Sequence, residues 1–164
     1  MAQDVSQAAD LATLLAEREI LRTMHQYSQA VDYSIEDRWV DCFTEDGVYE
    51  VDFPELPEKQ KTMRSDLRGR EALRRFAAAR AEGMRAEKRA VFQKHLPLVP
   101  LIDVHGDEAT VVSHFVGLDG EDGLPVVRDI GRYDDTFVRC EDGRWRIKHR
   151  HFTGHAYRQH PEDT

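Results

Sequence analysis

The sequence predicts an α+β domain in which helices come first and an antiparallel sheet follows. Two observations predict this class. Before residue 90 the apolar residues recur mainly at helical spacing, with one strand-like run at residues 48–53. After Val91 the apolar segments alternate like strands and are separated by turns that contain Gly106, Gly120 and Gly143. Helices grouped before strands favour a curved sheet wrapped on a few helices.

The helical part of the chain divides into three elements. The first helix is expected from about Leu11 to Asp32, with Asp10 as its N-cap and one apolar arc along its length. A second, short helix over residues 36–43 precedes the strand at 48–53, and a third helix covers 69–84. Residues 59–94 are rich in Lys and Arg, which indicates a solvated helix face.

The sheet part is expected to contain strands at residues 98–104, 109–118, 125–139 and 144–153, with a bend or bulge near Gly131. The segment 54–66 is the most loop-like and is long enough to close over a pocket as a lid. We expect a single domain over residues 1–164, with an ordered core of about 10–153 and a polar tail at 154–164.

Composition excludes several classes of protein. The 164 residues suit one domain, and the net charge of −8 is unfavourable for binding nucleic acid, which depends on neutralising phosphates. No apolar run approaches the roughly 20 residues that span a bilayer, and the first residues lack a secretory signal. Two cysteines give neither a disulfide framework nor a metal spacing. We therefore expect a cytoplasmic protein without nucleic-acid or membrane partners.

Asp32 and His95 are the first candidates for chemistry. Asp32 lies at the edge of the apolar arc of the first helix, where it either caps the helix or is buried with a partner. His95 lies in an otherwise apolar segment that leads into a strand, where a histidine is either a core residue or a base. If the two are close, the carboxylate fixes the imidazole tautomer and makes the other nitrogen a better base.

His114 is a third candidate, because it shares a strand face with Val112, Val116 and Leu118. We expect this face to line the concave side of the sheet, so that Val112 contacts substrate and His114 orients it. The alternative is a core histidine bonded to a backbone carbonyl.

The last two strands offer basic residues. Trp145, Ile147, His149 and His151 are expected to share one face, which makes His149 a candidate substrate contact. A metal site at these histidines is not expected, because nothing fixes a third ligand. One of Arg128 and Arg132 is expected to point inward, where it either pairs with an acid such as Asp129 or Asp134 or holds an anionic substrate group. The alternative is that both lie on the strand exterior. The sequence lacks a phosphate loop, a nucleophile elbow and a Cys-x-x-Cys pair, so no cofactor is expected.

Three stretches together resemble the SnoaL-like branch of the nuclear-transport-factor-two-like superfamily. They are YSQAVD at 27–32 with WVDCFTEDGVY at 39–49, GREAL at 69–73, and GRYDDTF at 131–137 with DGRWRI at 142–147. The resemblance covers nearly all of residues 10–153. The chain is most similar to the scytalone dehydratase, hexachlorocyclohexane dehydrochlorinase and bile-acid 7α-dehydratase members.

The resemblance implies a cone-shaped α+β barrel, that is, a curved mixed sheet closed by helices around a deep apolar pocket. It also implies a cofactor-independent lyase, often trimeric, that uses an Asp–His pair at the positions of Asp32 and His95. Tyr27 matches a pocket tyrosine of the bile-acid enzyme, and His114 matches a second pocket histidine of scytalone dehydratase. Tyr49 is a further expected substrate contact. Val31 departs from scytalone dehydratase, which has a tyrosine there, and no acid near Leu118 matches that of the bile-acid enzyme.

Three functions remain open at this point. The first is elimination of water, halide or a fragment such as formaldehyde from a small apolar, cyclic or aromatic molecule, with His95 as the base. The second is isomerisation or polyketide cyclisation with the same base. The third is a non-catalytic small-molecule binder. The expected partners are a small-molecule substrate and further copies of the chain, as a trimer or else a dimer.

Overall fold

The computed structural model describes residues 2–54, 65–86, 93–121 and 124–155. It contains three helices, α1 (Ala2–Asp32), α2 (Glu36–Val40) and α3 (Gly69–Ala86). The strands are β1 (Phe43–Asp52), β2 (Ser65–Arg68), β3 (Lys94–His105), β4 (Glu108–Glu121), β5 (Leu124–Arg139) and β6 (Trp145–His155). The predicted α+β class is confirmed, whereas the short strand β2 was not expected from the sequence.

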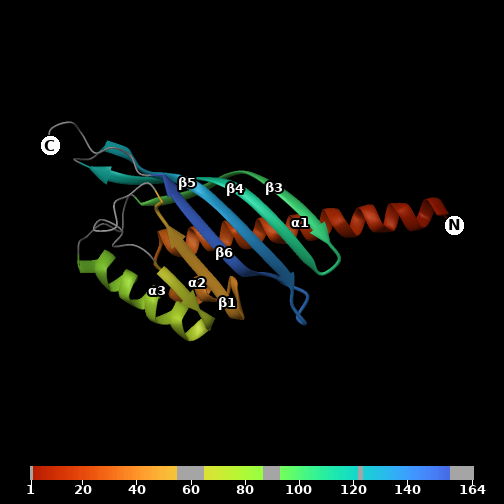
Figure 1. The fold of residues 1–164 in the computed structure, drawn as a ribbon, viewed down its shortest axis with the longest axis horizontal. Helices are drawn as coiled ribbons and strands as arrows, with labels where there is room; N and C mark the ends of the chain where they lie inside the picture. Colours follow the sequence, from red (N-terminus) through yellow and green to blue (C-terminus); the bar gives the residue numbers. More distant parts are fainter. Residues whose placement is uncertain (1, 55–64, 87–92, 122–123, 156–164) are drawn as a thin grey trace.

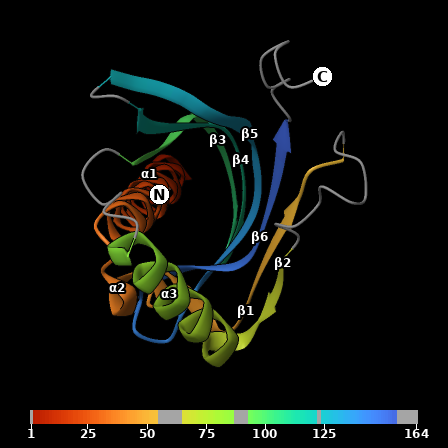
Figure 2. The same cartoon turned by 90° about the vertical axis from the view of Figure 1, so that its left-hand side faces the viewer.

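One sheet contains all six strands, in the order β2-β1-β6-β5-β4-β3. Neighbouring strands are antiparallel except β1 and β6, which are parallel, so the sheet is mixed as the family resemblance implies. Figure 2 shows that the sheet curves strongly around the three helices without closing on itself. The first half of α1 projects beyond the end of the sheet (Figure 1).

The core lies between the helices and the concave face of the sheet. Ile20 and Met24 of α1 are buried in one cluster together with Leu73 of α3 and with Phe137 and Ile147 of the sheet. Each such side chain contributes roughly 1.5–3 kcal/mol by leaving water. The Thr23 hydroxyl also donates a hydrogen bond of 2.7 Å to the Trp145 carbonyl, which fixes α1 against β6. The core therefore sets where the C-terminal end of α1 meets the sheet.

A β-bulge at Lys148 changes which side of β6 faces the core. The pairing of β5 with β6 skips this residue, so the alternation of side chains shifts by one. Ile147 is buried before the bulge and Arg150 after it. The predicted common face of Trp145, Ile147, His149 and His151 is therefore wrong, because His149 and His151 lie on the side opposite Arg150.

The predicted inner face of β4 is also wrong. Val111, Ser113 and Phe115 are buried on the concave side, whereas His114 is exposed and Val112 is only half-buried. Since successive side chains alternate between faces, His114 and Val112 lie on the convex side. The sequence misled here because apolar residues occupy both faces of this strand.

Gly131 lies in regular pairing with Phe115 and Gly154, so the bulge predicted near it is displaced. The irregularity in β5 occurs at Arg128, which the pairing with β4 skips. Most of the predicted lid, residues 54–66, lies outside the described residues, as does the predicted tail beyond His155. Within the described parts of the chain, the helices are too short or too polar to cross a membrane.

Candidate active site

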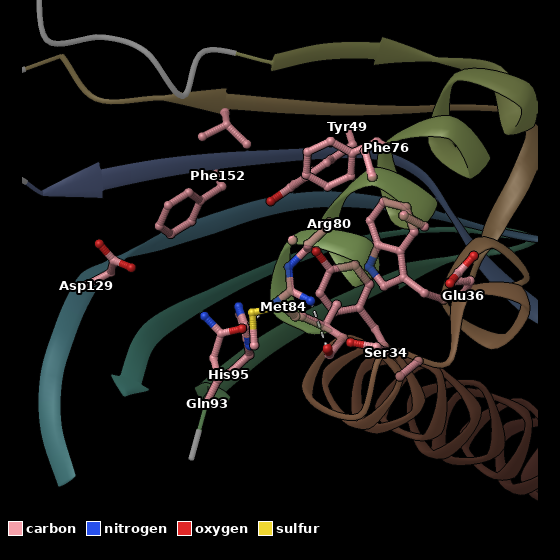
Figure 3. Close-up of a pocket in the computed structure, with 18 of the residues that line it drawn as sticks. Ser34, Glu36, Tyr49, Phe76, Arg80, Met84, Gln93, His95, Asp129 and Phe152 are labelled. Carbon is pink, nitrogen blue, oxygen red and sulfur yellow. Dashed lines mark hydrogen bonds between the residues drawn. The ribbon is translucent and has the colours of Figure 1, made fainter. Parts of the chain in front are cut away.

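A cavity of about 570 Å³ opens between α1, α3 and the concave face of the sheet (Figure 3). Its volume falls within the range of roughly 300–1,000 Å³ that is usual for small-molecule sites. Aromatic rings dominate its wall. They include Trp39, Phe53, Phe76, Phe115 and Phe152. The cavity therefore suits a small, mostly apolar molecule that contains a ring.

Asp32 and His95 meet at the edge of this cavity. Asp32 is the last residue of α1, and His95 is the second residue of β3. One oxygen of Asp32, Oδ1, accepts a hydrogen bond of 2.9 Å from the His95 backbone N–H and lies 2.8 Å from its ring Nδ1. The Asp32 side chain is only 6% exposed. The structure thus brings together the two residues that the sequence analysis paired, and it excludes an Asp32 that only caps its own helix.

This contact determines which ring nitrogen of His95 carries the hydrogen. An ionised carboxylate can only accept hydrogen bonds, so Nδ1 carries the hydrogen and Nε2 keeps its lone pair. His95 lines the cavity, and its ring packs against Phe115 with centroids 5.6 Å apart. The arrangement can hold a neutral imidazole ready to take a proton and can stabilise the imidazolium that results.

Three tyrosines line the cavity beside this pair: Tyr27, Tyr49 and Tyr133. Burial raises the pKa of Tyr49 well above its usual value, and charge interaction and a hydrogen bond with Tyr27 add to this. Burial also raises the pKa of Tyr133 well above its usual value. Their hydroxyls therefore stay protonated and can donate hydrogen bonds to a substrate oxygen.

Arg150 lies directly behind the tyrosines, where the bulge at Lys148 directs it. Its guanidinium lies 4.1 Å from the ring centroids of both Tyr27 and Tyr133. It donates two hydrogen bonds, of 2.8 and 2.6 Å, to the Asp135 carboxylate. Burial acts to lower the pKa of Arg150, but Asp135 outweighs this and raises it well above its usual value. The sequence analysis missed this ion pair, because strand alternation placed Arg150 outside.

Arg80 and Trp39 also line the cavity and were not among the predicted site residues. Arg80 follows Leu73 by seven residues on α3, so helical spacing places it on the same inward face. That spacing could have identified it, but the general richness in Lys and Arg concealed it. Trp39 is buried at 3% exposure.

Arg128 lines the cavity, as the sequence analysis allowed. The bulge in β5 turns its side chain inward next to Asp129. Arg128 pairs with Asp119 at 2.9 Å and with Asp129 at 3.7 Å. Burial raises the pKa of Asp129, although Arg128 and His95 act in the opposite direction.

The remaining predicted site residues do not line the cavity. His114 and Val112 lie on the convex side of β4, as described above. Arg132 is exposed and pairs with Asp134, two residues along its own strand. The His149 ring lies 2.6 Å from a carboxylate oxygen of Glu50, outside the cavity lining. Over the ranges that the structure describes, no three metal-ligating side chains come together.

Comparison with known proteins gives a family match. The family described as SnoaL-like domain matches residues 12–151. No curated protein matches the sequence. Among solved structures, a protein of unknown function from Mycobacterium tuberculosis is similar at 26% identity and a TM-score of 0.72, over 92% of this chain and 78% of that one.

Two structures from Novosphingobium aromaticivorans are also similar. An NTF2-like protein with a cystatin-like fold has 21% identity and a TM-score of 0.75, over 96% of this chain and 92% of that one. A protein proposed to be a scytalone dehydratase has 22% identity and a TM-score of 0.65, over 90% of each chain. These likenesses agree with the α+β fold.

Proposed function

The chain belongs to the SnoaL-like family, and from that premise we propose that it is a cofactor-independent lyase acting on a small cyclic or aromatic molecule. The single observation that carries this proposal is the contact of Asp32 with His95. One carboxylate oxygen accepts both the backbone and the ring N–H of His95, and the ring lines a cavity of aromatic side chains.

In the proposed reaction, Nε2 of His95 takes a proton from a carbon or a hydroxyl of the substrate. When the proton comes from carbon, the electron pair left behind forms a new C=C bond and expels hydroxide or halide from the neighbouring carbon. When it comes from a hydroxymethyl group, the oxygen pair forms the C=O bond of formaldehyde, the C–C bond breaks, and its electron pair stays on the remaining carbon. The imidazolium then gives its proton to the departing hydroxide, so that water leaves, or to the carbon from which formaldehyde was lost; after halide loss it gives the proton to solvent. Asp32 orients the ring throughout and stabilises its positive charge.

The tyrosines supply hydrogen bonds to the oxygen on which negative charge develops. Tyr27 and Tyr49 line the cavity, and the raised pKa of Tyr49 keeps its hydroxyl protonated. Such pre-aimed donors in a site shielded from water lower a barrier by about 2.7–4 kcal/mol each. His114, which was expected to orient the substrate, has no part in the proposed reaction because it lies outside the cavity.

The test is a screen of hydroxylated and halogenated aromatic compounds by mass spectrometry, using the native chain and His95→Gln. We expect a product lighter by the mass of the expelled molecule and a loss of roughly 10²–10⁴-fold in turnover for the variant. His149→Gln is the matched control, because it removes another histidine that contacts a carboxylate but lies outside the cavity.

Near-native turnover by His95→Gln would exclude this mechanism. A product of unchanged mass whose formation needs His95 would identify an isomerase or a cyclase that uses the same base. Binding of ring compounds with no chemical change in any of them would identify a non-catalytic binding protein.

A further inference from the structure

Arg80 is a cation in the cavity, and the groups that accept its hydrogen bonds are neutral. One Nη donates a hydrogen bond of 3.0 Å to the Val31 carbonyl, and the other donates to the side-chain oxygen of Gln93. Among the described residues, no carboxylate lies within ion-pairing distance of it. Burial lowers its pKa, although Tyr27, Tyr49 and Asp32 act in the opposite direction. In Figure 3 the Arg80 side chain lies inside the cavity, between Tyr49 and His95.

Trp39, which lines the same cavity as Arg80, carries an unused hydrogen-bond donor. Its indole Nε1–H is buried and has no hydrogen-bond partner among the described residues. The Trp39 ring lies 5.8 Å from that of Tyr27 and 6.0 Å from that of Tyr49. A buried donor without an acceptor costs about 1–3 kcal/mol, so an acceptor from a ligand would relieve a real penalty.

We propose that Arg80 and the Trp39 indole N–H form an anion-binding subsite, and that the natural ligand is a ring compound bearing a carboxylate or phenolate oxygen. The inference rests on the proposed function for its catalytic meaning, because it names the substrate class of the same cavity. The anionic oxygen lies against Arg80, and the ring extends toward His95. Arg80 would thereby fix which carbon of the ring compound faces Nε2.

Negative groups near the cavity are compatible with this placement. The Asp32 carboxylate is engaged by His95 through Oδ1. Asp129 lies apart from Arg80 in Figure 3 and is paired with Arg128. Arg128 already forms ion pairs with the carboxylates of Asp119 and Asp129, so it is less suitable than Arg80 for binding an anion. Arg80 is therefore the cation that a ligand anion would reach without displacing a carboxylate.

The test measures equilibrium binding of benzoate and of its neutral counterpart benzamide to the native chain by calorimetry. We expect benzoate to bind about 10–100-fold more tightly, as is typical of hydrogen bonds to a charged group. Arg80→Gln should abolish this preference, and Arg80→Lys should keep part of it. The control is Arg75→Gln, which removes an arginine from the exposed side of α3, where it pairs with Glu71. Trp39→Phe should weaken both ligands, because both present an oxygen acceptor.

A second probe separates the two sources of the anion. 4-Nitrophenol changes colour when it ionises, so binding at a fixed pH reports whether the site favours the phenolate. A gain of colour that depends on Arg80 indicates a site for phenolates. A preference for benzoate that depends on Arg80, with no gain of colour, indicates a site for carboxylates. Either result supports the inference. Equal affinity for benzoate and benzamide together with no colour gain would overturn it. So would a preference lost in Arg128→Gln but kept in Arg80→Gln.

The binding assay also keeps this inference separate from the proposed lyase activity. His95→Gln should retain the preference for benzoate while losing turnover. If benzoate preference depends on Arg80 but no compound is converted, the subsite stands and the lyase proposal fails. If compounds are converted without any preference for an anionic group, the lyase proposal stands and the subsite fails.

Discussion

Arg150 and Asp135 form a fully buried ion pair directly behind the tyrosines of the cavity. Two parallel hydrogen bonds, of 2.8 and 2.6 Å, join them, and their side chains are 1% and 0% exposed. The pair supports Tyr27 and Tyr133 from behind, because the guanidinium lies over both rings. It therefore links the stability of the core to the placement of the hydroxyls in the site.

Asp135→Asn and Arg150→Met should each destabilise the protein by about 3–5 kcal/mol, since each leaves one partner buried without its opposite charge. Arg132→Gln is the matched control on β5, the strand that also carries Asp135. It breaks the exposed pair with Asp134 and should change stability by about 0–1 kcal/mol. Urea unfolding followed by circular dichroism measures all three. A loss below 1 kcal/mol for Asp135→Asn would contradict the role assigned to the pair.

Asp32→Asn tests the charge of the proposed catalytic pair, Asp32 and His95, apart from its geometry. Because only Oδ1 accepts both hydrogen bonds from His95, an asparagine oxygen can keep both while the negative charge is lost. We expect turnover to fall about 10²-fold, from lost stabilisation of the imidazolium, with little change in stability. Asp32→Ala should lower turnover further and destabilise the chain by about 1–3 kcal/mol, because the His95 N–H groups lose their acceptor. Equal rates for native and Asp32→Asn would show that the charge is not used.

Stability should fall as the pH rises above about 9. Burial raises the pKa of Cys42 from its usual value to about 12, and burial also raises those of Tyr49 and Tyr133. In the unfolded chain, thiols and phenols ionise from about pH 8.5 to 10, so the unfolded state releases protons that the folded state retains. The stabilisation is complete below the unfolded pKa values and is lost as the pH rises toward the folded ones.

Urea midpoints measured between pH 8 and about 10.5 check this dependence. Cys42→Ala should flatten the fall in stability above about pH 9, whereas Cys140→Ala, at the other and less buried cysteine, serves as the control. A stability that is constant over this interval would contradict the burial of these groups.

Gly131 and Gly154 face each other where β5 and β6 come closest to the rings of the core. A Cβ at Gly131 would lie 2.6 Å from the Phe152 ring and against the Thr153 carbonyl oxygen, and one at Gly154 would overlap the Phe53 ring. Alanine at either position should destabilise the protein by about 1–3 kcal/mol.

Gly83→Ala is the opposite case within α3. A Cβ there meets no atom of the described chain within 4 Å, so this variant should stabilise the helix by roughly 0.5–1 kcal/mol. Thermal unfolding of the three glycine variants side by side measures the contrast. A stabilised Gly131→Ala would show that the two strands are not so closely packed.

The pairing of Asp32 with His95 was implied by the family resemblance, whereas local signals alone made each residue a candidate and left a capping or a core role open. Asp32 lies at the edge of an apolar helical arc, and His95 lies in an apolar strand segment. The inward position of Arg150 could not be predicted. One extra residue in a strand exchanges the two faces of the residues that follow it, and no residue type in the sequence indicates where such a bulge lies. The wrong face chosen for His114 has a different cause, namely a strand that is apolar on both sides.

The parallel pairing of β1 with β6 has a consequence for how the chain folds during synthesis. Val48 of β1 pairs with His149 of β6, so β1 is synthesised about 100 residues before the strand with which it pairs in parallel. Until then its inner edge exposes unpaired backbone groups, whereas β3, β4 and β5 can already form a meander. Tyr49 of β1 and Phe152 of β6 both line the cavity, so the ligand site is completed only when the last strand docks. Ligand binding would therefore report the final step of folding, and a ligand present in the cell would favour chains that have finished it.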